Sequence, residues 1–322
     1  MKDKEEFIYW SNRNEKEAVL HRMFGKSPNV LVPEQIQGHS VTEIGVYAFS
    51  DKNAVPETVV GDRKPDIWLK ELCGDYIEQI TLPESVISIA DLAFYNCRNL
   101  KEITVGAGIR SLGADAFMNC RKLHQIRIRA RIEEVTGLRI LLRQLNQNVR
   151  VVFESEGIMT AAFFFPEFMD GLDEIAPAHV FRRKIIGEGF RARQSFTDER
   201  IVPEAYDAVF AQALVEESEE NLLMMAVDRF IYPLYLRNVY KKKYEEYMRS
   251  HDKVLMELLL HDQRIEAIPP LLLADIFSES ALDHGIRLAQ KWNMTRVLAD
   301  LMLIISENRR KPGRSRYSMD DI

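Results

Sequence analysis

The sequence predicts an α+β chain in two halves: a short solenoid of parallel strands with short helical segments, followed by an all-α domain of antiparallel helices. Three observations support this. A 23-residue repeat fills residues 80–125, the composition changes after Glu156, and apolar residues recur at helical spacing from Pro203 onward. The 322 residues are enough for two domains that each bury a core of their own.

The repeat sets the architecture of the first half. Segments 80–102 and 103–125 align without gaps, and each offers a short strand, an Ala-Phe pair and an Asn-Cys pair at fixed offsets. One copy cannot bury its apolar face alone, so neighbouring copies are expected to stack around a shared core. An earlier copy covers 30–51 and is followed by an insertion at 52–76. The matched positions include Ile44, Ile89 and Leu112; Phe49, Phe94 and Phe117; and Cys97 and Cys120.

The pattern LPxSVxxIxxxAFxxCxxLxxI in this repeat resembles the BspA-like class of leucine-rich repeat over roughly residues 17–130. The first copy departs from the pattern, because Asp51 and Lys52 stand at its Asn-Cys positions. Proteins of this class are chiefly recognition surfaces, several of them on cell surfaces. The resemblance therefore implies a bacterial leucine-rich-repeat protein, here joined to an uncharacterised helical C-terminal domain.

The chain divides into four predicted parts. Aromatic residues are too frequent after Glu156 for a solvated tether, so we expect a structured connector there. Paired helices in 264–306 resemble an ankyrin-like array, although the T-P-L-H signature is missing, and Ser280 is expected to cap one of these helices. The predicted parts are 1–155, the solenoid with its caps; 156–200, the aromatic connector; 201–308, the helical domain; and 309–322, a disordered basic tail.

No residue pattern in the sequence indicates catalysis. Cys97 and Cys120 share one repeat position, which favours packing over a nucleophilic role. The seven histidines form no metal-binding motif, so we predict no metal and no cofactor, and a protein that is not an enzyme. One alternative stays open: an enzyme with a cleft between the two halves, in which Arg182, Arg183 or Arg193 holds an anionic substrate.

Composition and charge favour a cytoplasmic protein without a membrane segment. The charged start MKDKEEFIYW lacks the apolar core of a signal peptide, and the most apolar stretch, 161–165, is too short to span a bilayer. A net charge of -6 argues against non-specific nucleic-acid binding. We therefore predict a protein or peptide partner, with no nucleic acid and no small-molecule cofactor.

The partner is expected on the strand face of the solenoid, where residues between the inward apolar positions form polar columns. Basic clusters elsewhere are typical of a solvated face, and an acidic partner is the alternative. In a further alternative the chain is a scaffold or regulator that binds through its helical domain. The predicted partner-binding residues are Gln79, Thr81, Glu102, Thr104, Gln125 and Arg127; the predicted basic patch is Arg129, Arg131, Arg182, Arg183 and Arg193.

Overall fold

A computed structural model describes residues 7–52, 68–175 and 179–310. Its contacts divide the chain into two compact units, Met1–Glu216 and Glu217–Ile322. The first contains the β-solenoid and the second is helical, which confirms the predicted α+β class. From residue 311 onward the predicted tail lies outside the described residues, and the predicted division of the chain into four parts stays a prediction.

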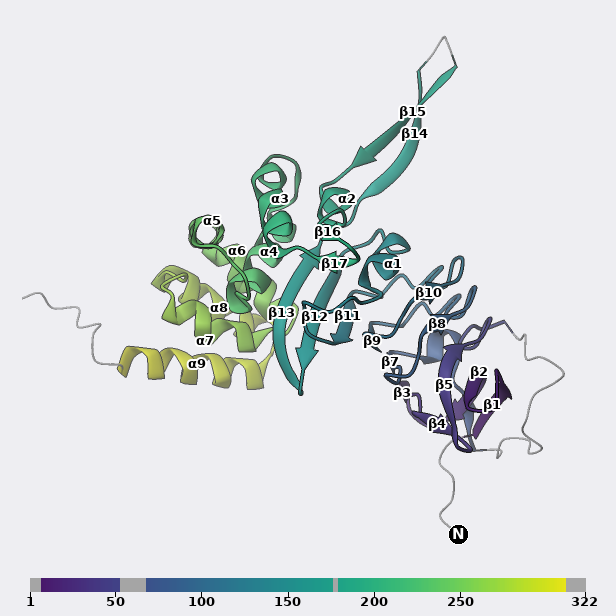
Figure 1. The fold of residues 1–322 in the computed structure, drawn as a ribbon. Helices are drawn as coiled ribbons and strands as arrows, with labels where there is room; N and C mark the ends of the chain where they lie inside the picture. The colour runs from purple at the N-terminus through teal and green to yellow at the C-terminus, as the bar shows by residue number, and fades with distance from the viewer. Residues whose placement is uncertain (1–6, 53–67, 176–178, 311–322) are drawn as a thin grey trace, which may run out of the picture. The chain divides into compact units, whose positions relative to one another are not determined.

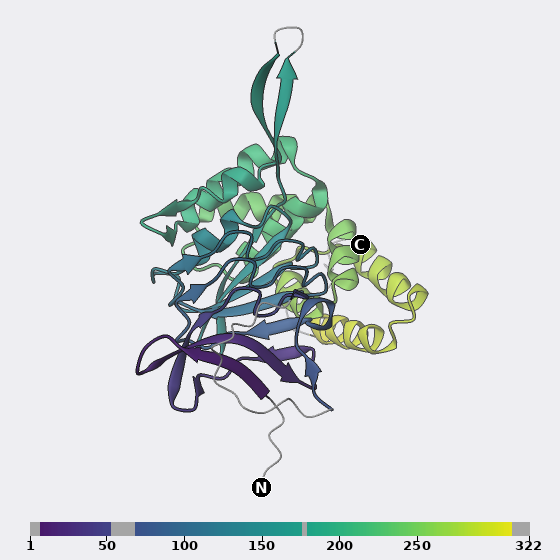
Figure 2. The same cartoon turned by 90° about the vertical axis from the view of Figure 1, so that its right-hand side faces the viewer.

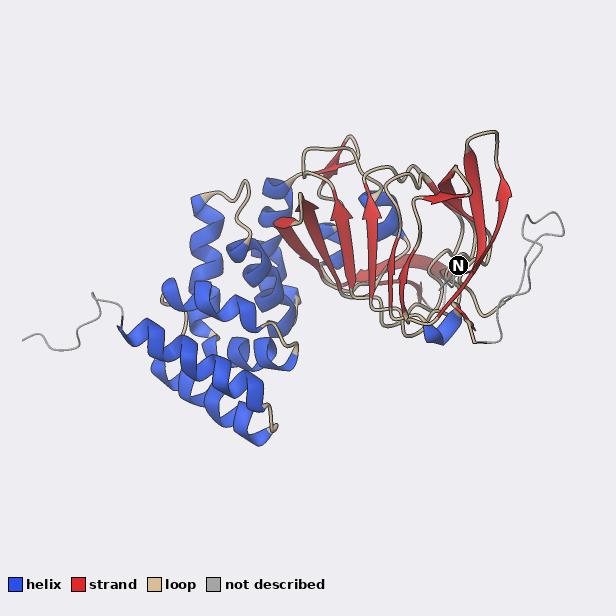
Figure 3. Ribbon diagram, turned by 90° about the horizontal axis from the view of Figure 1, so that it is seen from below, coloured by secondary structure: helices blue, strands red, loops and turns tan. Residues whose placement is uncertain are grey.

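The repeats build one long ladder of strands. Within the described residues, a six-stranded sheet runs in the order β13-β12-β11-β9-β7-β3, and Figure 1 labels these strands. Figure 3 shows strands of the solenoid side by side. All neighbouring strands in it are parallel except β13, which pairs antiparallel with β12 at one edge. Register follows the 23-residue period, because Ile80 lies opposite Ile103 and Ile103 opposite Ile126. The strands are β3 (Asn29–Leu31), β7 (Gln79–Thr81), β9 (Glu102–Gly106), β11 (Gln125–Arg129), β12 (Val149–Ser155) and β13 (Ile158–Phe165).

A second ladder lies across the coils, again counted over the described part of the chain. Its main path is β1-β2-β5-β8-β10, with β4 paired to β5 and β6 paired to β2. Ile44 lies opposite Ile89, and Ile89 opposite Leu112, as the sequence alignment predicts. The strands are β1 (Phe7–Asn12), β2 (Glu17–Gly25), β4 (Gln35–Ile36), β5 (His39–Ile44), β6 (Lys70–Glu71), β8 (Ser88–Ile89) and β10 (Ser111–Leu112), and a 3-10 turn, η1, covers Gly74–Tyr76.

Stacked aromatic rings fill the interior of the coils. The rings of Phe49 and Phe94 lie 5.3 Å apart and 4° from parallel, and those of Phe94 and Phe117 lie 5.1 Å apart and 2° from parallel. In coils 80–102 and 103–125 the chain returns from the second ladder to the first through tight turns rather than through a helix. Leu92 and Asn96 in one such turn have φ of 55° and 63°, a left-handed conformation that a continuing helix excludes.

The departure of the first copy from the repeat pattern is compensated by polar contacts. Asn119 donates to Asn96 at 2.8 Å, and Asn96 donates to both carboxylate oxygens of Asp51 at 3.0 and 3.1 Å, so an aspartate continues the asparagine ladder. The buried guanidinium of Arg22 donates to the carbonyls of Ser50 and Lys52 in the same coil. The first coil therefore stacks on the second despite its different residues.

Helices and strands close the far end of the solenoid unit. Tyr206 of α3 packs its ring edge-on against Phe163 and Phe165 of β13, with ring centroids 5.0 and 5.5 Å apart. Residues after β13 form a hairpin that stands out from the solenoid strands (Figures 1 and 2). The elements of this region are α1 (Leu138–Arg143), β14 (Met169–Ile175), β15 (Val180–Ile186), α2 (Gly189–Ala192), β16 (Phe196–Thr197), β17 (Arg200–Ile201) and α3 (Pro203–Glu216).

The helical unit packs around leucines, methionines and Tyr244. A buried ion pair joins Asp228 of α4 to Arg264, with oxygen and nitrogen 2.6 Å apart. Ser278 caps α8 by accepting from the Ala281 N–H, so the cap predicted at Ser280 is wrong by two residues. The helices are α4 (Glu219–Ile231), α5 (Asn238–Ser250), α6 (Asp252–His261), η2 (Ile265–Ala267), α7 (Ile268–Leu273), α8 (Glu279–Lys291) and α9 (Thr295–Arg310). Over the described residues, no helix has the length and apolar character needed to cross a membrane.

Candidate partner-binding face

Two rows of side chains run across the outward face of the six-stranded ladder. Successive side chains on a strand point to opposite faces. Because Ile80, Ile103 and Ile126 are buried in the interior, the residues on either side of each project outward. Strand register then fixes the two rows. The first row is Asn29, Gln79, Glu102, Gln125 and Arg150, and the second is Leu31, Thr81, Thr104 and Arg127. We call these residues the strand face; it contains all six predicted partner-binding residues.

Ion pairs and hydrogen bonds fix the centre of the strand face. Glu102 accepts from the Gln125 amide at 2.5 Å and from the Arg127 guanidinium at 3.1 Å. Arg127 also donates to Glu154 at 3.1 Å. Burial lowers the pKa of Arg127, but these two carboxylates raise it by more, so the net shift is upward and the guanidinium stays charged. The centre therefore offers polar groups of fixed geometry, in which the one guanidinium is paired with two carboxylates.

The rim of the strand face is more open than its centre. Gln79 is exposed and Thr81 half-buried, whereas Thr104 is buried beside Glu102. Leu31 continues the second row and is 64% exposed. An apolar side chain next to ordered polar ones is a common combination at protein interfaces.

Sequence reasoning missed the two ends of this face. The alignment of Pro33 with Pro83 has an offset of 50 residues, and the same offset makes Leu31 equivalent to Thr81. The two residues do lie opposite each other in the sheet, so the sequence contained enough information to identify Leu31. Arg150 is harder to find, because β12 pairs with β11 at an offset of 25 residues instead of 23.

The structure does not bring the five arginines of the predicted basic patch together. Arg129 is at the end of β11 and pairs with Glu84 at 2.9 Å, and Arg131 pairs with Glu133 at 3.4 Å. Two others, Arg182 and Arg183, lie on the protruding hairpin. Arg129 and Arg131 therefore lie at and just after the end of β11, and each pairs with a nearby carboxylate. Arg182 and Arg183 lie elsewhere, on the hairpin.

Arg193, the fifth of them, is 6% exposed. Its guanidinium donates to four backbone carbonyls, and burial lowers its pKa to about 10. This geometry ties the loop before β12 to the chain after β13. The acceptors are Leu145 at 3.0 Å, Gln147 at 2.8 Å, Gly189 at 2.9 Å and Pro166 at 2.5 Å.

The repeated cysteines point into the solenoid core. Cys97 donates its S–H to the carbonyl of Phe49, and Cys120 donates to that of Phe94, each at 3.1 Å. The hydrogen bond with Cys120, together with burial, raises the pKa of the Cys97 thiol well above its usual range. A buried, protonated thiol is a poor nucleophile. The part of the chain that is described holds no cluster of three or more His, Cys, Asp or Glu residues suited to a metal ion.

Stacked parallel strands, a 23-residue period, buried Phe and Cys ladders and a part-buried Asn ladder define a leucine-rich-repeat solenoid. Residues 68–138 match the family described as BspA type Leucine rich repeat region, in six copies. Residues 68–138 are thus a leucine-rich-repeat region of the BspA type. Repeats of this kind generally serve as protein-interaction modules and are generally not enzymes.

Among solved structures, the chain resembles the T. pallidum leucine-rich-repeat protein TpLRR at 22% identity and a TM-score of 0.23. The alignment covers 39% of this chain and 70% of that one. No curated protein matches the chain.

Proposed function

We propose that this protein is a non-catalytic interaction module that binds a protein or peptide through the strand face. The observation that carries the proposal is the fixed polar geometry of Glu102, Gln125 and Arg127 at the centre of the continuous ladder. Side chains already held in place lose little conformational entropy on binding, which favours affinity. The cytoplasmic location and the ankyrin-like character of the helices stay predictions from the sequence.

The face suits a partner that forms hydrogen bonds more than one with a high charge. Arg127 pairs with two carboxylates and the neighbouring Arg129 with Glu84, so two cations meet three carboxylates and only one negative charge of this group is uncompensated. Exposed Leu31 adds an apolar contact at one end of the second row. A peptide that combines polar side chains with one apolar anchor fits this arrangement.

Gln79→Arg tests the proposal in the full-length chain. Gln79 is exposed on β7, one strand in from the edge of the ladder, so the longer cation blocks this part of the face without disturbing the core. Ser111→Arg is the matched control, because Ser111 is also exposed on a strand but belongs to the second ladder. Each tagged variant is used to capture partners from extract of the native cell, and retained proteins are quantified by mass spectrometry.

We expect Gln79→Arg to reduce retention of the partner by about tenfold or more, and Ser111→Arg to leave it unchanged. Equal retention by both variants and the wild-type chain contradicts the proposal. In that case Leu303→Arg, a change at an exposed position of α9, tests the helical domain as the binding element.

A further inference from the structure

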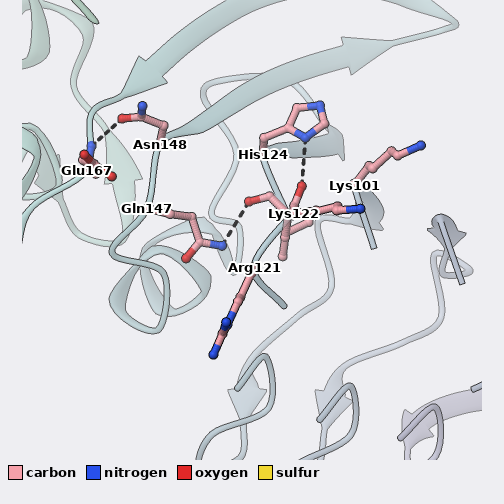
Figure 4. Close-up of a pocket in the computed structure, with 8 residues that line it drawn as sticks. Lys101, Arg121, Lys122, His124, Gln147, Asn148 and Glu167 are labelled. Atoms are coloured by element: carbon pink, nitrogen blue, oxygen red, sulfur yellow. Dashed lines mark hydrogen bonds between the residues drawn. The ribbon is translucent and has the colours of Figure 1, made fainter. Parts of the chain in front are cut away.

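A hollow of about 390 Å³ lies at one edge of the six-stranded ladder, where its parallel strands begin. Arg121, Lys122 and His124 come just before β11, and Lys101 just before β9. Figure 4 shows Lys101 and Lys122 extending in one direction and Arg121 in another. We call this region the cationic hollow; it is lined by Lys101, Arg121, Lys122, Leu123, His124, Gln147, Asn148 and Glu167.

Positive charge in the cationic hollow is only partly compensated. Lys101 donates to Glu78 at 2.8 Å, but Lys122 donates to a neutral acceptor, the side-chain oxygen of Asn99, at 2.9 Å. Neither Arg121 nor Lys122 has a carboxylate partner among the residues that the structure describes. The hydrogen bond from Lys101 lowers the pKa of Glu78, and the charges of Lys101 and Lys122 lower it further. The lysine side chains at this edge of the ladder therefore stabilise the ionised form of a nearby carboxyl group.

The backbone of the cationic hollow is not arranged to hold a phosphate. A phosphate site usually offers several free N–H groups that converge on one point. Here those of Lys101, Leu123, His124 and Glu167 already donate, to Glu78, Cys120, Lys101 and the side chain of Asn148 respectively. Recognition of an anion in the hollow is left to side chains.

The spacing of the cations also favours an extended ligand. Side chains that point in different directions match carboxylates distributed along a chain better than one compact anion (Figure 4). Among the residues that the structure describes, no Phe, Tyr or Trp lines the cationic hollow, so these residues provide no stacking platform of the kind that single-stranded nucleic acids use. The Glu167 carboxylate at the rim also disfavours a densely charged ligand.

We propose that the cationic hollow binds an acidic segment of a protein partner, with Arg121 and Lys122 pairing with its Asp or Glu side chains. The proposal deepens the proposed function, since the hollow adjoins the strand face at the start of β9 and β11. A partner crossing the strand face then places its acidic segment at this edge.

The test is fluorescence anisotropy with a labelled Glu-Ser repeat peptide and the full-length chain, and a Gln-Ser peptide of equal length is the uncharged control. In the variant, Arg121→Gln is combined with Lys122→Gln. Arg98→Gln is the matched control, because Arg98 holds the same coil position 23 residues earlier, is paired with Asp75 and does not line the hollow. All three substituted side chains lie at the surface, and circular dichroism checks that each variant is folded.

We expect the wild-type chain to prefer the Glu-Ser peptide, the double variant to bind it about tenfold more weakly or worse, and Arg98→Gln to change binding less than about twofold. Equal losses from the double variant and from Arg98→Gln indicate unspecific charge attraction and overturn the proposal. Stronger competition by inorganic phosphate or by a single-stranded oligonucleotide than by the unlabelled Glu-Ser peptide also overturns it.

The strand face and the cationic hollow can fail separately. If Gln79→Arg leaves partner capture intact while peptide binding still depends on Arg121 and Lys122, the strand-face proposal fails and the hollow stands. If Gln79→Arg abolishes capture and no charge-specific peptide binding is found, the strand face stands and the hollow is refuted.

Discussion

Replacement of Phe94 by alanine tests whether the ring stack holds the coils together. Phe94 is fully buried and stacks on both Phe49 and Phe117. A buried Phe→Ala change costs about 3–5 kcal/mol, and each aromatic pair adds about 0.5–1.5 kcal/mol beyond its buried area. Phe117 is nearly as buried but stacks on Phe94 alone among the described rings. We therefore expect Phe94→Ala to cost about 4–5 kcal/mol and Phe117→Ala about 1 kcal/mol less.

Hydrogen exchange of the amides in β7 and β9, read by mass spectrometry, measures this loss within the solenoid alone. Urea unfolding followed by circular dichroism supplies the global free energy of unfolding. Tyr95→Ala is the control, because Tyr95 is next in sequence but only half-buried, and we expect it to cost under about 2 kcal/mol. A loss from Phe94→Ala no larger than that from Phe117→Ala would refute the idea that two-sided stacking sets the coil-to-coil free energy.

Two further predictions concern buried charge. Arg193→Lys leaves at least one of four carbonyls without a donor, so we expect a loss of about 1–3 kcal/mol in urea unfolding, against under about 1 kcal/mol for the exposed Arg191→Lys. Glu188 is 3% exposed, and burial raises its pKa, so the folded chain holds this proton to higher pH than the unfolded chain does. The contribution of Glu188 to stability should therefore decrease as pH rises from the ordinary glutamate pKa to the raised one. Urea midpoints measured across this pH range should show the decrease in the wild-type chain and not in Glu188→Gln. Parallel pH slopes for the two chains would contradict this assignment.

The sequence predicts the coil-to-coil register because the period is strict. Ile80, Ile103 and Ile126 are matched in the alignment and lie opposite one another in the sheet. Leu31 follows from the same logic once the insertion is counted. Local spacing is thus sufficient wherever the chain repeats itself.

Prediction fails where a contact depends on residues outside the repeat. Arg22 comes from β2 and supplies donors to the first coil, a role that no spacing within that coil encodes. Arg193 looks like one of several basic residues in the sequence, yet it is buried because distant carbonyls converge on it. Charge alone does not distinguish a solvated arginine from one that organises backbone.

Coils 80–102 and 103–125 are interchangeable as building units. Each presents a Phe ring, an Asn amide and a Cys thiol at the same offsets, and each of these groups contacts its equivalent or the same carbonyl one coil earlier. In-frame duplication or loss of 23 codons thus leaves every remaining coil with a compatible neighbour. The length of the strand face is free to change in single steps during evolution while both ends of the stack keep their own closing strands.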